Sequence, residues 1–202
     1  MASRRPRLSR DAVLSAALLV IDEEGLEACT MRAVAAELGV EAMSLYWHVP
    51  GKEALLDGVV ERVLAEVAEE HEPAGDWRTG LAGFATAFRR VILRHPGVAP
   101  LLASRPLGAY ATASRLAEDG VRRLEAAGFD RSTAIDAARS VARYVVGFTL
   151  AEAARPLAEP PPGSSPMMDE LLGRVARDDP AALFHFGLEV MLDGLATRLP
   201  TV

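Results

Sequence analysis

Residues 30–52 read TMRAVAAELGVEAMSLYWHVPGK, and this stretch decides the fold. Apolar residues recur at helical spacing over residues 31–38, so we expect a short amphipathic helix there, with Thr30 as its N-cap. Gly39 interrupts the pattern, and a second short helix is expected from about residue 41 to 48. Two short helices joined by a tight glycine turn have the form of a helix-turn-helix.

The second helix of this motif has two different faces. Its inward residues are expected to be Val40, Leu45 and Val49, and its outward residues Ala42, Met43, Tyr46 and Trp47, with Ser44 and His48 along the flank. Aromatic side chains at helical spacing are common in protein cores, which leaves a purely structural role open. On an outward face, Tyr, Trp and His can each donate a hydrogen bond to a phosphate oxygen. Lys52 adds a positive charge at a helix start, so the pattern favours a surface that binds a DNA backbone.

Helical periodicity continues along the chain, and no segment shows the strict alternation of a β-strand. Ser9 is the expected N-cap of the first helix, which begins at about Arg10 and stops at Gly25. Further helices are expected over about 52–70, 77–94, 96–102, 107–127, 131–155, 167–177 and 180–198, with a proline-rich loop over 156–166. The sequence therefore predicts an all-α fold, in which an N-terminal three-helix helix-turn-helix domain (residues 1–52) joins a larger helical domain (residues 53–202).

The composition is that of an ordinary globular protein rather than of a basic nucleic-acid coat. Half of the 202 residues are apolar and the net charge is −6, so any positive charge that meets DNA must be local. Such a local cluster precedes the first acidic residue, at Arg4, Arg5, Arg7 and Arg10. The single cysteine, Cys29, has no partner for an internal disulfide, and no apolar run approaches the ~18 residues of a membrane span. These features predict a cytoplasmic protein without contact to a membrane.

The side chains that build metal centres and catalytic sites are scattered along the sequence. The four histidines, His48, His71, His95 and His185, show no ligand spacing and have no adjacent cysteine. No nucleophile elbow, phosphate-binding glycine loop or paired-carboxylate pattern stands out. We therefore expect no metal, no cofactor and no enzymatic activity.

Residues 38–49, LGVEAMSLYWHV, followed by Lys52 and by ALLD at 54–57, closely resemble the tetracycline-repressor (TetR) family. The likeness to that family's tetracycline-repressor branch extends along the chain to Phe88-Arg89-Arg90, Leu93-Arg94, Ser104-Arg105-Pro106, Gly128-Phe129 and the stretch FHFGLE at 184–189. The resemblance implies a ligand-responsive, DNA-binding transcriptional regulator. In such a regulator, a homodimer binds a palindromic operator and a small molecule releases it.

The resemblance also implies which side chains meet double-stranded DNA. Base edges would be contacted by Arg32, Ala42, Met43 and Ser44, and phosphates by Tyr46, Trp47, His48 and Lys52. Two positions depart from the tetracycline repressor, because Ala42 replaces a glutamine and Met43 replaces a proline. Alanine and methionine can touch a thymine methyl group but make no bidentate hydrogen bond to a base. We therefore expect a different operator, with Arg32 and Ser44 supplying the polar contacts.

The effector pocket that the resemblance implies also departs from the tetracycline site. Leu101 replaces a histidine that binds magnesium, and Phe84 replaces an amide, so a tetracycline–magnesium chelate is not the expected effector. The acid that the partner subunit contributes in the repressor falls near Ala151, with Glu152 one position away. A small apolar or aromatic effector is expected instead, bound by Phe84, Phe88, Leu101, Leu102 and Tyr110. Each of these residues can equally be an ordinary core residue.

The helices expected over 131–155 and 180–198 suit the homodimer that the resemblance implies. Small residues such as Gly147 and Gly187 let helices approach closely, and larger ones such as Phe184 fill the seam between them. Packing within a single chain is the alternative. For the whole protein, the alternative hypothesis is a helical small-molecule binding protein whose N-terminal unit is vestigial.

Overall fold

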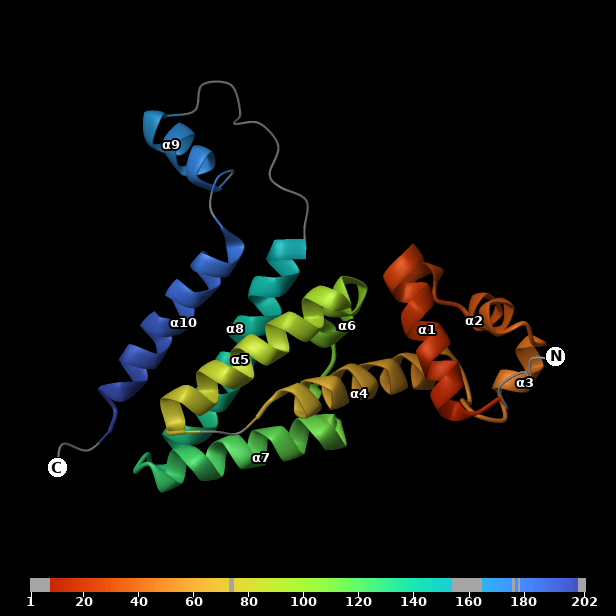
Figure 1. The fold of residues 1–202 in the computed structure, drawn as a ribbon, viewed down its shortest axis with the longest axis horizontal. Coiled ribbons are helices and arrows are strands. Elements are labelled where there is room, and N and C mark those ends of the chain that lie inside the picture. Colours follow the sequence, from red (N-terminus) through yellow and green to blue (C-terminus); the bar gives the residue numbers. More distant parts are fainter. Residues whose placement is uncertain (1–7, 73–74, 154–164, 176, 178, 200–202) are drawn as a thin grey trace, which may run out of the picture.

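The computed structural model describes residues 8–72, 75–153, 165–175, 177 and 179–199. Almost all of these residues are helical and none forms a β-strand, which confirms the predicted all-α fold. Figure 1 shows an elongated molecule, with a small head of N-terminal helices at one end and a larger helical body behind it. The predictions made for Arg4, Arg5, Arg7 and the loop residues 156–164 lie outside the described residues.

The head consists of α1 (Arg10–Glu24), the 3₁₀ turn η1 (Leu26–Ala28), α2 (Met31–Leu38) and α3 (Ala42–Leu45). The side chains of Ser9 and Thr30 cap α1 and α2, because each accepts a hydrogen bond of 3.1 Å from the backbone N–H three residues later. Gly39, between α2 and α3, has a left-handed φ of 63°, a conformation that glycine adopts without strain. Both predicted caps and the predicted glycine turn are confirmed.

α3 is shorter than the helix predicted over residues 41–48. Regular α-helix ends at Leu45, and Tyr46, Trp47 and His48 continue as a tight turn. In this turn the N–H of His48 donates to the carbonyl of Leu45, only three residues back, at 2.9 Å. The predicted length of this helix is therefore wrong, although its position is correct.

α4 (Lys52–Glu70) connects the head to the body (Figure 1). It packs against α1 near its start and against the body further along, with Val59, Val63 and Val67 fully buried. Gly58 allows the close approach of α1, because a Cβ atom there would lie 2.4 Å from Cδ2 of Leu14. Since α4 belongs to both cores, the position of the head depends on the position of α4 in the body.

The body contains α5 (Trp77–Arg94), α6 (Ala99–Ser104), α7 (Ala111–Ala126), α8 (Arg131–Ala153), α9 (Pro166–Val175) and α10 (Pro180–Ala196). Single 3₁₀ turns precede α6 and α7, at η2 (Pro96–Val98) and η3 (Leu107–Ala109). The segments predicted over 96–102 and 107–127 are therefore each divided into a 3₁₀ turn and an α-helix. None of the helices in the described ranges is long and apolar enough to cross a membrane.

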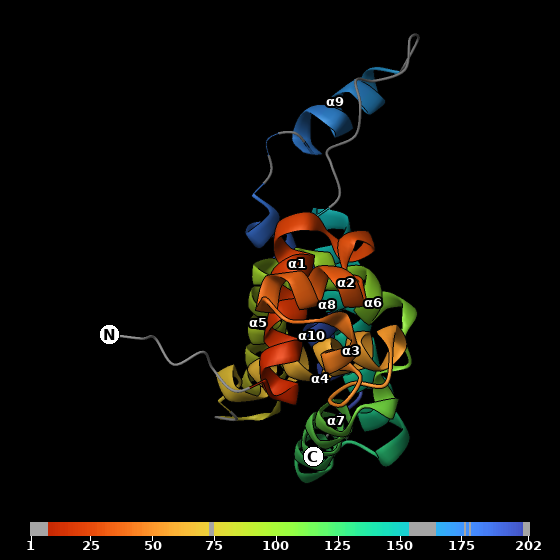
Figure 2. The ribbon, with the colours of Figure 1, turned by 90° about the vertical axis from the view of Figure 1, so that its right-hand side faces the viewer.

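α8 lies at the centre of the body and contacts α5, α6, α7 and α10. Its contact with α10 is aromatic: the ring of Phe184 stacks on Tyr144 and meets Phe148 edge-on, with both pairs of centroids 5.3 Å apart. α9 stands apart from the other helices in Figures 1 and 2, and none of its residues is buried. α10 is therefore fixed to the body through α8, whereas α9 has no comparable anchor within the described chain.

The head meets the body a second time where α1 ends beside η2. His95 lies between two carboxylates, with Nδ1 2.7 Å from Asp22 of α1 and Nε2 3.2 Å from Glu66 of α4. Gly97 is so close to α1 that a Cβ atom there would lie 2.8 Å from the carbonyl oxygen of Ile21. This contact and α4 together set the orientation of the head.

Candidate nucleic-acid interface and internal cavities

The outer side of α3 and of the turn that follows it is apolar and aromatic yet exposed. Trp47 is 89% exposed, Met43 73% and Tyr46 46%, whereas Leu45 and Val49 on the other side are buried. Large apolar side chains gathered on a surface usually mark a place where another molecule binds. The local sequence explains the arrangement, because helical spacing puts Leu45 and Val49 on the core side and turns Met43, Tyr46 and Trp47 to solvent.

The polar residues predicted for this surface surround the exposed aromatic residues. Arg32 on α2 and Lys52 at the first position of α4 are exposed, and Ser44 and His48 are half-buried. No side chain caps the start of α4 at Gly51, so its first N–H groups have no capping acceptor beside Lys52. A helix start of this kind attracts a phosphate, and Lys52 adds a full positive charge.

Ala42 differs from the other residues expected on the outward face. It is half-buried, and it packs against the hydrophobic core of the head. The first turn of α3 faces partly toward α2, which explains why this methyl group is less accessible than Met43 beside it.

A large cavity of about 720 Å³, open to the surface where exposed residues of α8 line it, lies between α4, α5, α6, α7 and α8. Of the five residues expected to bind an effector, Phe84, Phe88 and Leu102 line it. Leu101 and Tyr110 are not among its lining residues: Leu101 is buried in the core, and the hydroxyl of Tyr110 donates to Asp57 at 2.8 Å. The walls are mainly apolar and aromatic, with the rings of Phe84 and Phe88 5.6 Å apart.

Several lining residues of this cavity were not predicted from the sequence. His71, Arg105 and a strip of α8 that includes Ala138, Ala142 and Arg143 also face it. Of these, only Arg105 could have been found from the sequence, as part of the resemblance at residues 104–106. His71 had no such signal, because its place in the wall depends on how the end of α4 packs against α5.

Arg105 connects the cavity wall to the helix that carries the head. Its guanidinium forms ion pairs with two carboxylates of α4, with Glu53 at 2.8 Å and with Asp57. Desolvation acts to lower the pKa of Arg105, but the acidic partners and Tyr110 raise it above its ordinary value. The side chain therefore stays charged. It binds the first turns of α4, close to Lys52.

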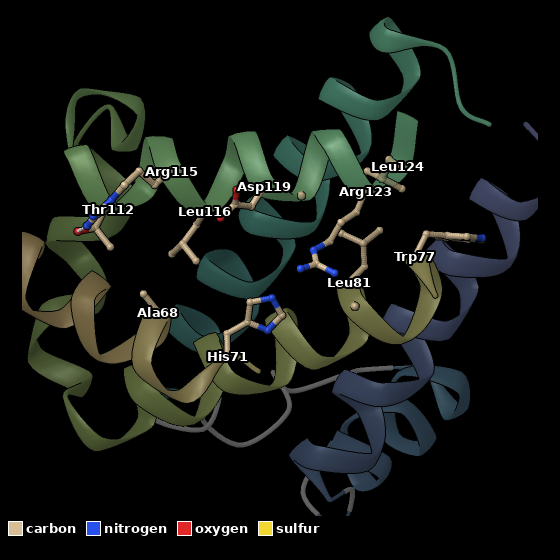
Figure 3. Close-up of a pocket in the computed structure, with 12 residues that line it drawn as sticks. Ala68, His71, Trp77, Leu81, Thr112, Arg115, Leu116, Asp119, Arg123 and Leu124 are labelled. Carbon is tan, nitrogen blue, oxygen red and sulfur yellow. Dashed lines mark hydrogen bonds between the residues drawn. The ribbon is translucent and has the colours of Figure 1, made fainter. Parts of the chain in front are cut away.

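A smaller side cavity of about 300 Å³ lies between α4, α5 and α7 (Figure 3). It shares three lining residues with the large cavity: His71, Leu81 and Leu116. The side chain of His71 thus stands where the two cavities adjoin. Burial, and to a lesser extent the nearby charge of Arg123, holds the pKa of His71 below its usual value of 6.5, so the imidazole is neutral at neutral pH.

Glu152, the acid nearest to the position expected to serve a partner subunit, is engaged within its own chain. It binds Arg89 of α5 through two hydrogen bonds of 3.0 and 2.6 Å, and both side chains are only 15% exposed. The same guanidinium lies over the ring of Phe184, 5.2 Å from its centroid. This ion pair joins α5, α8 and α10.

α10 has one buried face and one exposed apolar face. Phe184 and Leu188 are buried within the chain, and a Cβ atom at Gly187 would lie within 3.2 Å of three atoms of Tyr144, so these residues serve packing inside the protomer. The opposite face exposes Leu183, Phe186 and Val190, and Phe186 is 68% exposed. In the described part of the chain, nothing covers this apolar face.

Metal-ligating side chains do not gather anywhere in the described residues, where no group of three His, Cys, Asp or Glu residues could hold an ion. The candidate binding sites of these residues are thus the outer side of α3 and the two cavities.

Two models of known protein families match this chain. The model for bacterial regulatory proteins of the tetR family matches residues 13–59, and the model for the tetracyclin repressor-like C-terminal domain matches residues 70–199. Together they cover both the head and the body.

Individual relatives agree with these matches. A transcriptional regulator of Saccharopolyspora erythraea is 37% identical over 148 residues, which are 73% of this chain and 62% of that protein. The class A tetracycline repressor from Escherichia coli is 33% identical over 201 residues, which are 95% of this chain and 92% of the repressor.

Solved structures with the same architecture include TetR from Acinetobacter baumannii AYE and ActR from Streptomyces coelicolor in complex with actinorhodin. TetR has a TM-score of 0.80 at 32% identity, covering 96% of this chain and 100% of that one. ActR has a TM-score of 0.79 at 28% identity, covering 95% of this chain and 96% of that one.

Proposed function

The chain belongs to the TetR family of bacterial regulators, and we propose that it is a homodimeric repressor released from a palindromic operator by a small apolar or aromatic effector. As a member of this family it is a ligand-responsive, DNA-binding transcriptional regulator and not an enzyme. Operator binding also implies a location in the cytoplasm. The outer side of α3 is the observation that carries the proposal.

In the proposed complex, residues 1–52 bind DNA and residues 53–202 bind the effector and form the dimer. Met43, Tyr46 and Trp47 are exposed beside the positive charge of Lys52, which suits a negatively charged, partly apolar groove. We assign base contacts to Arg32, Ala42, Met43 and Ser44, and phosphate contacts to Tyr46, Trp47, His48 and Lys52. Because Ala42 is half-buried, Met43 is the larger apolar contact to a thymine methyl group.

The large cavity supports an apolar effector. Its volume of about 720 Å³ is in the range of sites that enclose a drug-sized molecule. Phe84 and Phe88 offer aromatic faces to such a molecule. The family relative ActR holds actinorhodin in its structure, which supports a small-molecule effector for this fold.

Arg105 offers a physical route from the effector to DNA. An effector that pushes on α6 displaces Arg105, whose ion pairs with Glu53 and Asp57 hold the start of α4. Because α4 carries the head, a shift of its first turns changes the separation of the two reading faces in a dimer. A palindromic operator has a fixed half-site spacing, so binding is then lost.

We propose that the dimer forms through α8 and α10. The exposed residues Leu183, Phe186 and Val190 repeat along one side of α10, as a helix-to-helix interface requires. Ile135 and Leu150 add exposed apolar area on α8.

The test of DNA binding uses the DNA that flanks the protein's own gene, in a gel-shift or fluorescence-anisotropy titration over a range of salt concentrations. Wild-type affinity should fall steeply as salt rises, since several phosphates are neutralised. Lys52→Ala combined with Tyr46→Phe should weaken binding at least about tenfold, and loss of each lysine–phosphate contact should flatten the salt slope by about 0.9.

Arg131→Ala is the matched control, because Arg131 is an exposed cation at the start of α8 and far from α3. It removes the same charge and should leave the affinity unchanged. No salt-dependent binding by the wild type, or equal losses in both variants, would contradict the proposed function. The first result would favour the alternative of a small-molecule binding protein with a vestigial head.

A further inference from the structure

His71 has a buried polar atom without a partner. Its Nδ1 atom is shielded from solvent and has no hydrogen-bond partner among the described residues. The ring meets Phe84 edge-on, with centroids 5.7 Å apart, so aromatic packing fixes its orientation. A buried nitrogen without a hydrogen-bond partner lowers the stability of the fold. Such groups therefore call for an explanation, for example a molecule that binds there.

Arg123 extends over the side cavity from α7, opposite His71. Figure 3 shows the two side chains pointing toward one another across the cavity. Asp119, the one acidic residue on the cavity lining, is paired with Arg122 instead. Within the described part of the chain, Arg123 forms no ion pair, so its charge is available to a bound molecule.

At the Thr112 end of the side cavity the free atom is an acceptor, because Oε2 of Glu61 is buried without a hydrogen-bond partner among the described residues. At the far end, Thr112 donates to Glu61 from both its hydroxyl and its backbone N–H, at 2.6 and 3.0 Å. Arg115 donates to the Thr112 hydroxyl at 3.1 Å. The Thr112 end thus offers the carboxylate of Glu61, which repels an anion, and the unpaired groups that can donate to an acidic group lie between His71 and Arg123.

We propose that the side cavity binds an acidic group of the effector, held between the guanidinium of Arg123 and Nδ1 of His71. A carboxylate or similar anion accepts hydrogen bonds from both, with His71 in the tautomer that carries its proton on Nδ1. The apolar part of the same molecule occupies the large cavity, which adjoins at His71, Leu81 and Leu116. The effector is thus an apolar or aromatic acid, which rests on the proposed effector-binding function and narrows it.

Two fluorescent dyes test this assignment on the full-length protein. Anilinonaphthalene sulfonate and neutral phenylnaphthylamine share one aromatic framework and differ in the acidic group. The wild type should bind the sulfonate at least about tenfold more tightly, as expected for one charge-assisted contact in a partly enclosed site. Arg123→Gln should remove this preference and leave the affinity for the neutral dye unchanged.

Arg131→Gln is the matched control, because it removes the same charge from an exposed side chain that lines neither cavity. It should keep the preference for the sulfonate. His71→Phe, which retains an aromatic ring beside Phe84, should reduce the preference, and thermal unfolding checks that each variant is folded. As an independent variant, Gly120→Leu places a side chain where a Cβ atom meets nothing within 4 Å, and should block the sulfonate selectively.

The outcomes separate the two proposals. Equal affinity for both dyes, or the same loss in Arg131→Gln as in Arg123→Gln, overturns the acidic subsite while the effector cavity stands. Failure of the protein to bind either dye contradicts both the subsite and the effector cavity of the proposed function. Selective loss in Arg123→Gln alone supports the subsite.

Discussion

The buried imidazole of His71 makes the stability of the fold depend on pH. Its pKa lies below the usual 6.5, because burial disfavours the charged ring and Arg123 repels it. The unfolded chain therefore binds a proton at a higher pH than the folded chain does. As the pH falls below about 6.5, the free energy of unfolding should decrease until the folded imidazole also titrates.

This loss should be measurable as a lower urea midpoint at about pH 5.5 than at about pH 7.5. His71→Gln lacks the titrating group, so the drop between these pH values should be smaller than in the wild type. His48→Gln, a histidine of the head that lines neither cavity, is the control and should behave as the wild type. Parallel pH curves for wild type and His71→Gln would contradict the assignment. Hydrogen bonds also lower the carboxyl pKa values of Glu70, Asp76 and Asp130. These groups change the free energy of unfolding only at a more acidic pH.

At the scale of elements, the contact of η2 with α1 is a tight point of the junction between head and body. A Cβ atom at Gly97 would lie 2.8 Å from the carbonyl oxygen of Ile21, and a backbone atom has little freedom to move away. Gly97→Ala should therefore push α1 from the body and lower the free energy of unfolding by about 1–3 kcal/mol, as overpacked sites do.

Gly120→Ala is the matched substitution for Gly97→Ala in denaturant unfolding. Gly120 lies inside α7 with open space around its Cβ position, so alanine should stabilise the protein by about 0.5–1 kcal/mol. Opposite signs for the two glycines are the expected result. A neutral or stabilising Gly97→Ala would show that the junction yields easily.

At the scale of the whole molecule, the exposed face of α10 determines whether two heads act together. Phe186→Glu places a charge on the proposed interface, which is costly to desolvate, so the variant should be monomeric where the wild type is dimeric. Sedimentation or light scattering gives the mass directly. Because Phe186 points away from the body, folding of the protomer should be preserved, which circular dichroism checks.

Leu19→Glu is the control for this change, since Leu19 is an exposed apolar residue of α1 at the other end of the molecule. Its mass should equal that of the wild type. A dimer that survives Phe186→Glu would place the interface elsewhere. The monomer should also bind the operator weakly. Its single head contacts one half-site, without the added affinity of a second, linked head.

Most of the local structure was predictable from the sequence. The caps at Ser9 and Thr30 and the turn at Gly39 depend on atoms within a few residues, so their chemistry is visible in a short stretch. The apolar spacing likewise fixed the course of the helices and the outward position of Met43, Tyr46 and Trp47. The length of α3 was less predictable, because apolar periodicity does not distinguish a continuing α-helix from the turn in which His48 N–H bonds to Leu45, three residues back.

What only the tertiary structure decided is which residues meet across different helices. Leu101 and Leu102 are adjacent and equally apolar, yet only Leu102 lines the cavity, because successive residues on a helix point about 100° apart. Glu152 pairs with Arg89, which lies 63 positions earlier in the chain. His71 and Arg123 face one cavity only because α4, α5 and α7 pack together. The sequence thus determined the family and the DNA-binding motif, which reside in contiguous residues, whereas long-range packing determined the shape and chemistry of the effector site.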